Sequence, residues 1–332
     1  IISIDDIDID SFNSPKIKSI FTTKEWIEYI SEDSDAIPII IKIEKERELI
    51  GYFTCLKIKK FGIGIIGSPF EGWSTCYMGF DFVHDANRMD ILPTLCEFLY
   101  REFKCSYIEV TDRTISIEEA EKYGFVYIPV HTLELEIDRT DEELFNVFKS
   151  DCRNFIRQFE RRGATIEIAE PNDIFAEEYY CQLEDVFAKQ GLVPNYSCKK
   201  VKCILKHLKD TDNVLCIRVR DQEGNSIATS IFFGYNNKFY FWGGASYRSG
   251  QHYRPNEYMI WTAIKYWRDR GCSTFDMVGV RDYKRKFGPH EEVYAKLIFT
   301  KYPILLPLRN MAKKAYFTLL KVKGLVRNKN KK

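Results

Sequence analysis

The residues best suited to chemistry lie in two short basic loops. The first, Tyr247–Arg254, carries two arginines, a histidine and a glycine directly before an expected helix. The second, Arg281–Gly288, carries four cations after an expected strand. Backbone N–H groups at a helix N-terminus, the positive end of the helix dipole and guanidinium groups all favour a phosphate or another anion. One such loop alone is usually a solvated turn, but two loops at the same end of a sheet predict a cationic cleft.

The elements that position these loops are a strand, a helix and a second strand. An unbroken aromatic run at Phe239–Trp242 predicts a strand buried on both faces, which the next two glycines end or bulge. Pro255 is placed to open a helix whose apolar residues recur at helical spacing. The second strand, 273–279, alternates Asp276 with large apolar residues. Its carboxylate therefore has a defined direction.

The order of elements is repeated along the chain. In the first half we expect strands at 39–44, 49–59 and 62–66, then a long loop, a helix at 88–103 and a strand at 106–111. In the second half we expect a helix at 141–162, strands at 165–169, 214–220, 226–234 and 239–242, and then the segment described above. This repeat predicts two packed α/β lobes, 1–138 and 139–303, followed by a tail at 304–332. Ligands commonly bind where two such lobes meet.

Several of these segments resemble the double acyltransferases of the GNAT superfamily, specifically the CelD/BioF-like group related to the Fem peptidyltransferases. The resemblance covers roughly residues 15–305 and is moderately specific. It implies an α/β (α+β) fold of two tandem GNAT-like lobes, each a mixed, mostly antiparallel sheet with flanking helices. The matching pieces are Arg254-Pro255-Asn256 before Trp261-Thr262-Ala263-Ile264, Phe275-Asp276-Met277, Phe287-Gly288, the basic helix Lys149–Arg162 and the loop Ser68–Phe80.

The resemblance also implies roles for individual residues. Acyl transfer to an amine needs a positioned donor, a deprotonated amine and a group that protonates the leaving atom. We expect Asp276 or His252 to act as the base and Tyr247 as the acid, with the strand opening at Gly243-Gly244. The expected donor-binding residues are Gly244, Arg248, Gly250, Arg254 and Asn256. The expected acceptor-binding residues are Trp73, Tyr77, Arg153, Lys284 and Lys286.

Each of these roles has a plain structural alternative. The alternative for Asp276 is capping the following loop, for His252 an exposed loop position and for Tyr247 packing. Asp276 is preferred among the three, because its strand directs it toward the cleft. For Trp73 alone, packing is slightly favoured. The stripe of Lys149, Arg153 and Arg157 is typical of a solvated helix face.

We therefore expect an N-acyltransferase that moves an acyl group from acyl-CoA, acetyl-CoA included, to the amine of an amino sugar or of a nucleotide- or lipid-linked surface-polysaccharide precursor. One alternative is Fem-like transfer from aminoacyl-tRNA to a cell-wall precursor. It is favoured because no second small residue follows Gly250 at the place where the superfamily's acyl-CoA loop has one. The lack of a long inserted helical hairpin argues against it. Another alternative is a non-catalytic module that binds a glycan or polyanion.

The composition of the 332 residues is that of an ordinary globular protein, with 45% hydrophobic and 29% charged residues. No apolar run approaches the length of a membrane helix, and the first ten residues are acidic, unlike a signal peptide. Ten scattered cysteines include no C-x-x-C pair, and we find no ligand spacing between them and the five histidines, so we expect no metal site and no disulfide framework. The expected compartment is the cytoplasm.

The tail differs electrostatically from the body. Residues 301–332 hold ten Lys and Arg and no Asp or Glu, which leaves residues 1–300 with 39 cations against 48 anions. Apolar residues recur at helical spacing between the cations, from Leu308 to Val326. Such a helix is equally suited to an anionic membrane on the inner face of the envelope and to docking on the body. Nucleic acid other than tRNA is not expected, because the body is acidic.

Overall fold

The computed structural model describes residues 18–84 and 86–329, with residues 324–329 described as backbone only. The acidic first ten residues and the last lysines of the tail lie outside this range. The chain divides into two compact units: unit 1 is Ile1–His131 with Glu292–Leu308, and unit 2 is Thr132–Glu291 with Arg309–Lys332. The ranges 1–138, 139–303 and 304–332 remain a prediction about domains. The compact units follow a different path, because residues 292–308 return to unit 1.

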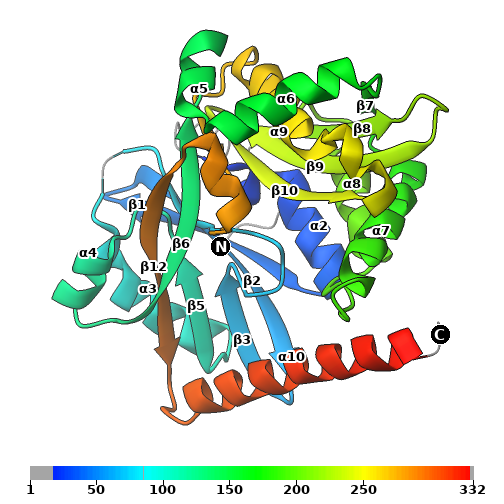
Figure 1. The fold of residues 1–332 in the computed structure, drawn as a ribbon. Helices are drawn as coiled ribbons and strands as arrows, with labels where there is room; N and C mark the ends of the chain where they lie inside the picture. The colour runs from blue at the N-terminus through cyan, green and yellow to red at the C-terminus, as the bar shows by residue number, and fades with distance from the viewer. Residues whose placement is uncertain (1–17, 85, 330–332) are drawn as a thin grey trace. The chain divides into compact units, whose positions relative to one another are not determined.

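Figure 1 labels the described helices and strands. Three of them include residues of both units, and the rest belong to one unit each. The shared elements are β6 (Val126–Glu136), β12 (His290–Thr300) and α10 (Leu305–Lys329). Unit 1 holds the 3₁₀ helix η2 (Ile20–Thr22), α2 (Lys24–Ser34), β1 (Ile37–Lys45), β2 (Glu48–Lys60), β3 (Ile63–Ser68), β4 (Gly79–Phe82), α3 (Arg88–Glu102), β5 (Tyr107–Thr111) and α4 (Ile117–Lys122).

Unit 2 holds a longer series of elements. These are α5 (Asp141–Val147), α6 (Ser150–Arg161), β7 (Thr165–Ala169), α7 (Asp173–Ala188), α8 (Cys198–Leu208), β8 (Val214–Arg220), β9 (Ser226–Tyr235), β10 (Lys238–Ser246), η3 (Arg248–Tyr253), α9 (Pro255–Arg268), β11 (Thr274–Asp276) and η4 (Asp282–Phe287).

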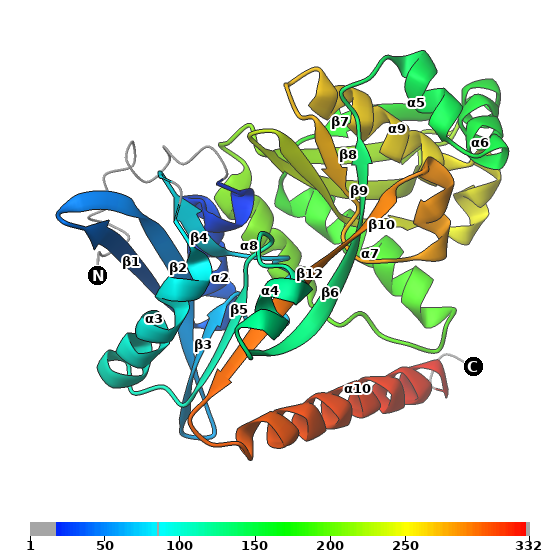
Figure 2. The ribbon, with the colours of Figure 1, turned by 90° about the vertical axis from the view of Figure 1, so that its left-hand side faces the viewer.

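The sheet of unit 1 has the order β1-β2-β3-β5-β12, with β4 added on β2. All its pairs are antiparallel except β3 and β5, which are parallel and are joined through α3. Helix α3 packs on the sheet (Figure 2) through Met89, Leu92, Leu95, Cys96 and Leu99, a spacing that places them on one helix face. The sequence therefore folds this half as one sheet with a crossover helix.

The sheet of unit 2 runs β6-β11-β10-β9-β8-β7. Only β10 and β11 are parallel, and α9 joins them. The core on one face combines strand residues with α5, α6 and α9, where the Trp267 ring of α9 stacks on Phe239. Helix α7 packs against β9 and β10, and its Tyr179 ring contacts Trp242. The predicted mixed, mostly antiparallel α/β fold is confirmed.

Some expected elements differ from the observed ones. The helix expected at 141–162 is broken into α5 and α6, because Phe148 is extended and buries its ring against Trp261 and Phe287. The strand expected at 239–242 continues to Ser246 after a register shift between Phe241 and Gly243. The strand expected at 273–279 stops at Asp276, because Val278 and Gly279 have positive φ angles.

Candidate active site in unit 2

The candidate site lies where β10 and β11 end. The two strands pair in parallel only from Lys238 to Tyr240 and from Thr274 to Asp276. Parallel neighbours direct their carboxyl ends to the same edge of a sheet. The loops that follow, η3 and η4, therefore begin at the same end of unit 2, as the sequence predicts.

Asp276 ends β11 and is fully buried. Its Oδ1 accepts hydrogen bonds from Thr132 Oγ1 at 2.6 Å and from Val278 N at 2.8 Å, so it caps the turn after the strand. Its Oδ2 has no hydrogen-bond partner among the described residues. Burial, together with the nearby Glu134 carboxylate, raises the pKa of Asp276.

The charged neighbour with the largest effect on this pKa was not predicted from the sequence. Glu134 of β6 is the cross-strand partner of Asp276 and is itself 2% exposed. The Lys238 ammonium lies 2.8 Å from Glu134 Oε1. The available signal was the alternation of Thr132, Glu134 and Glu136 with leucines at the end of the expected strand.

Lys284 holds the turn that follows Asp276. Its ammonium donates hydrogen bonds to the carbonyls of Met277 at 2.5 Å, Val278 at 2.7 Å and Gly279 at 3.4 Å. The residue is 4% exposed, and its ammonium lies 5.6 Å from the centre of the Phe241 ring of β10. Because the ammonium is directed at backbone carbonyls, the cationic contribution of η4 to an open cleft is smaller than its sequence suggests.

The N-terminus of α9 carries a second group of contacts. Arg254 occupies the N-cap in the left-handed conformation, and within the described structure no side chain caps this helix end. Its guanidinium lies 4.3 Å from the centre of the Phe155 ring of α6, and its buried Nε has no hydrogen-bond partner among the described residues. Lys286 lies 5.5 Å from the same ring and forms an ion pair with Glu257. Phe155, which the sequence analysis did not single out, thus brings together two predicted binding residues.

The other predicted residues of the first loop lie nearer the surface. Arg248, His252 and Asn256 are exposed, and Tyr247 is half-buried. The Nδ1 atom of His252 lies 2.7 Å from the Ser249 carbonyl. Burial raises the pKa of Tyr247. Within the described part of the chain, Asp276, Tyr247 and His252 form no hydrogen bond with one another.

Two glycines near the end of β10 are required by close contacts, Gly250 in the loop and Gly243 in the strand. A Cβ at Gly250 would lie 2.7 Å from Ile227 Cβ, and Gly250 is buried. Gly244 is exposed and has more room for a side chain than its neighbour Gly243. A Cβ at Gly243 would lie 2.2 Å from Tyr179 Oη. The predicted opening at Gly243-Gly244 is therefore a bulge that admits Tyr179, while the parallel pairing with β11 ends earlier, at Tyr240.

Arg153 lies on α6 beside an open hollow of about 690 Å³. Its Nη1 donates to the carbonyls of Phe145 at 3.1 Å and Phe148 at 3.0 Å, which secures the end of α5. The hollow is lined by both charge signs: Asp141, Glu142, Phe145, Asn146, Arg153, Arg157, Glu160, Trp261 and Lys265. It is not a purely cationic surface.

The two aromatic residues predicted for acceptor binding belong to unit 1 and are buried there. Trp73 is 4% exposed, and its carbonyl accepts a hydrogen bond from Tyr29. Tyr77 is 7% exposed and packs edge-on against Phe21 and Tyr294. Both side chains therefore pack within the core of unit 1.

Unit 1 has its own acid after the parallel strand of its crossover. Asp112 follows β5 and is buried. Its Oδ2 accepts from Phe80 N at 2.9 Å and from Arg88 Nε at 3.0 Å, and its Oδ1 accepts from the backbone and hydroxyl of Thr114. Both oxygens of this carboxylate are satisfied.

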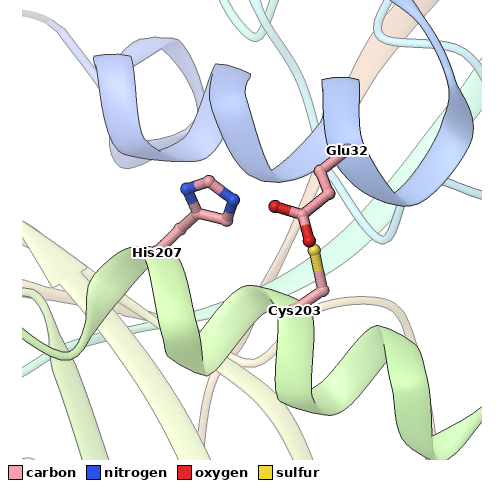
Figure 3. Close-up of side chains that lie close together, drawn as sticks. All are labelled: Glu32, Cys203 and His207. Atoms are coloured by element: carbon pink, nitrogen blue, oxygen red, sulfur yellow. The ribbon is translucent and has the colours of Figure 1, made fainter.

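One ligand spacing was overlooked in the sequence. Cys203 and His207 lie one turn apart on α8, and Figure 3 shows both side chains on the same side of that helix. Glu32, also labelled there, comes from α2 of unit 1. Two ligands are fewer than the four that a structural zinc site takes, so the pair carries no metal assignment.

Comparison with known proteins relates the chain to the GNAT fold. Residues 146–285 match the family model of the acetyltransferase (GNAT) domain, a range that includes Arg254, Asp276 and Lys284. The lipid II:glycine glycyltransferase of Staphylococcus epidermidis is 23% identical, over 67% of this chain and 72% of that protein. The crystal structure of FemX shares the fold with a TM-score of 0.73 at 16% identity, over 93% of this chain and 98% of that chain. A tandem GNAT protein from the clavulanic acid biosynthesis pathway has a TM-score of 0.51 at 9% identity, over 84% of this chain and 94% of that chain. The chain is thus a tandem GNAT-fold protein related to the Fem transferases.

Proposed function

We propose that this protein transfers an aminoacyl group from an aminoacyl-tRNA to the free amine of a lipid-linked cell-wall precursor. The observation that carries the proposal is the relationship, over two thirds of both chains, to proteins named for glycyl transfer to lipid II. This relationship supports the Fem-like alternative more strongly than the acyl-CoA donor that was our first expectation. The absence of a second small residue after Gly250 points the same way.

The surroundings of β10 and β11 also support a donor other than acyl-CoA. In acyl-CoA-dependent GNAT enzymes these strands separate and the donor lies against the freed backbone. Here the buried Lys284 ammonium already binds the carbonyls of residues 277–279 and lies beside Phe241. A donor lying along this backbone would have to displace that ammonium.

The proposed reaction forms one bond and breaks one. The acceptor amine attacks the ester carbon of the aminoacyl-tRNA, an N–C bond forms, and the C–O bond to the tRNA ribose breaks. The proton lost by the amine replaces the aminoacyl group on the ribose oxygen. Atoms and charge balance without a further reactant, so the protein's task is positioning and proton transfer.

The proton-transfer roles go to Asp276 and Tyr247. Asp276 Oδ2, which has no hydrogen-bond partner among the described residues, takes the amine proton once the acceptor reaches it, and its raised pKa makes the carboxylate a stronger proton acceptor. Tyr247, whose own pKa is raised and which therefore keeps its proton, serves as the acid for the leaving oxygen. His252 is a second candidate base from the exposed side of the same loop.

Arg254 and Lys286 are proposed to bind a phosphate of the donor or acceptor. Among the described residues, no side chain caps the N-terminus of α9, where Arg254 lies, and Arg254 Nε has no hydrogen-bond partner. Helix N-termini and guanidinium groups together favour phosphate oxygens. Lys286 contributes if the phosphate draws it from Glu257.

The donor is tested first. We would incubate the purified protein with radiolabelled glycyl-tRNA, with other aminoacyl-tRNAs or with acetyl-CoA, each in the presence of lipid II, and measure label on the lipid. We expect transfer from an aminoacyl-tRNA and none from acetyl-CoA. Transfer from acetyl-CoA alone would restore the acyl-CoA assignment. Lipid II binding without transfer from any donor would favour a binding module.

The role of Asp276 is tested with two substitutions. Asp276→Asn keeps an oxygen that accepts from Thr132 and Val278 but removes the base, whereas Asp276→Ala removes both functions. If Asp276 is the base, the Asn variant remains folded and loses about 100-fold or more in kcat. Asp282→Asn, an exposed acid in η4, is the matched control and should be unaffected. Full activity of the Asn variant would leave Asp276 with its capping role alone.

A further inference from the structure

A run of exposed apolar side chains lies along α10. Its side chains from Pro307 to Lys323 are exposed, except for the half-buried Arg309 and Leu320. Leu308, Met311, Leu319 and Val322 are between 49% and 67% exposed. Monomeric proteins rarely leave so many large apolar side chains in water along one element. This face therefore needs an occupant.

The apolar residues form a stripe along one side of the helix. Leu308, Met311, Ala315, Leu319 and Val322 follow one another at spacings of three or four residues, which places them on the same face. Tyr316 donates a hydrogen bond to the Asn195 carbonyl of unit 2 at 3.3 Å, yet Tyr316 itself is 49% exposed. This contact leaves the stripe uncovered. Val326 continues the pattern in the sequence, but its side chain lies outside the described residues.

The charges of the helix identify the occupant. Residues 301–332 contain no Asp or Glu, while Lys313, Lys314, Lys321 and Lys323 lie among the exposed residues. Two such helices packed together would bring cations close without any carboxylate to pair with them. An anionic lipid surface, by contrast, accepts the apolar stripe and attracts the cations at once.

We propose that α10 binds an anionic membrane surface, lying in the plane of the interface with its apolar stripe in the lipid. Within the described residues, no helix combines the length and apolar character needed to cross a bilayer. Binding along the surface does not require that length or apolar character, because the helix keeps its cations at the lipid head groups. This inference is independent of the proposed function, because it uses no residue of the candidate site.

The test is co-sedimentation of the full chain with vesicles. We would compare vesicles of phosphatidylcholine alone with vesicles of equal parts phosphatidylcholine and phosphatidylglycerol. We expect the protein to bind the anionic vesicles at least tenfold more tightly, and binding to weaken as salt is added. Equal binding to both vesicles, or no binding to either, would overturn the proposal.

Two variants separate the apolar stripe from the charges. Replacing Leu308, Met311, Leu319 and Val322 by Ser should weaken binding more than about a hundredfold. Replacing the four lysines by Gln should weaken it by at least tenfold, since each cation near an anionic surface contributes roughly a fivefold gain. Both variants should unfold thermally like the parent chain, because the altered side chains are exposed.

A matched control comes from the turn between β2 and β3. Phe61 is 99% exposed and is preceded by the exposed Lys59 and Lys60. Replacing these three by Ser, Gln and Gln removes apolar and cationic groups away from α10, and we expect unchanged vesicle binding. A loss as large as that of the α10 variants would overturn the proposal. A second outcome would also overturn the proposal: light scattering shows that the parent is a dimer and the Ser variant a monomer, and neither protein binds vesicles. The stripe would then be a contact between copies of the chain.

Discussion

Both units contain a strand, helix and parallel strand crossover, but the charged groups at its end are paired with one another only in unit 1. In unit 1 the crossover is β3, α3 and β5, and in unit 2 it is β10, α9 and β11. A buried aspartate follows or ends the second strand in each, Asp112 and Asp276. Each helix begins beside an arginine, Arg88 and Arg254.

In unit 1 these groups satisfy one another. Arg88 binds Asp112, and the side chain of Asn87 caps the N-terminus of α3. In unit 2 Arg254 lies over Phe155, α9 has no side-chain cap, and Asp276 Oδ2 and Arg254 Nε have no hydrogen-bond partner in the described structure. Buried groups left unpaired carry a free-energy cost and usually have a functional reason. Under the proposed function, the paired groups of unit 1 contribute stability and the unpaired groups of unit 2 are left for substrates.

The largest effect is expected where the charges are paired. Arg88→Met should lower the free energy of unfolding by about 3–5 kcal/mol, because Asp112 would be left buried without its cation. Urea unfolding measures this change. Arg101→Met on the same helix removes an exposed ion pair with Glu102 and should cost below about 1 kcal/mol. Similar losses for both variants would contradict the structural role of the Arg88 pair.

A smaller effect, on activity and not on folding, is expected for the arginine of unit 2. Arg254→Asn keeps a residue that tolerates the left-handed conformation but removes the cation. We expect kcat/KM for transfer to fall roughly thirtyfold, corresponding to about 2 kcal/mol for one charge-assisted contact. Arg270→Asn, at the other end of the α9 segment, is the control. If the Arg254→Asn variant were fully active, the anion site at α9 would be wrong.

The helix caps give the next test. Asn87→Ala should lower the free energy of unfolding by about 1 kcal/mol, because Asn87 accepts a hydrogen bond from Met89 N at the start of α3. The rate of transfer should not change, because the groups described at this helix end are already paired with one another. A fall in transfer rate with unchanged stability would mean that both crossovers take part in the reaction.

The smallest effect is a difference in pH dependence. Because burial raises the pKa of Asp276, the folded chain holds this proton more tightly than the unfolded chain does. The contribution of Asp276 to stability is therefore favourable at low pH and is lost as the pH rises through its folded-state pKa. We would measure the free energy of unfolding of the parent and of Asp276→Asn as a function of pH. The two values should stay a constant amount apart at low pH, and the parent should lose stability relative to the variant as the pH rises toward the folded-state pKa of Asp276. Parallel curves would show that Asp276 ionises as freely as in the unfolded chain.

The crossover of unit 2 was predictable because its signals are local. Aromatic residues at 239–242, Pro255 and the alternation around Asp276 each depend on neighbouring residues, and strand, helix and strand follow as expected. The end of β11 was placed too late, since nothing in the residue type of Val278 indicates its positive φ angle. The turn at Val278 is held by hydrogen bonds from Lys284, which lies ten positions after the start of that strand.

The fate of charged side chains was less predictable than the fold. The sequence predicts the same role for Lys284 and Lys286. In the structure, Lys284 donates hydrogen bonds to three backbone carbonyls, whereas Lys286 forms an ion pair with Glu257. Glu134 became important only as the cross-strand partner of Asp276, at a separation of 142 positions in the numbering. Trp73 and Tyr77 resembled a binding surface because they lie on a long loop, but the loop folds inward. Such outcomes depend on distant partners that a local pattern does not contain.

The path of β12 has a consequence for protein synthesis. This strand pairs with β5 and supplies Ala295 and Leu297 to the core of unit 1, although it is encoded after almost all of unit 2. While the ribosome is still producing unit 2, β5 lacks one neighbour and exposes the backbone of a sheet edge, which invites pairing with other chains. Unit 1 therefore begins first but lacks this strand until residues 132–291 of unit 2 have been made. We expect β5 to remain an open sheet edge in the nascent chain until residues 296–300 emerge.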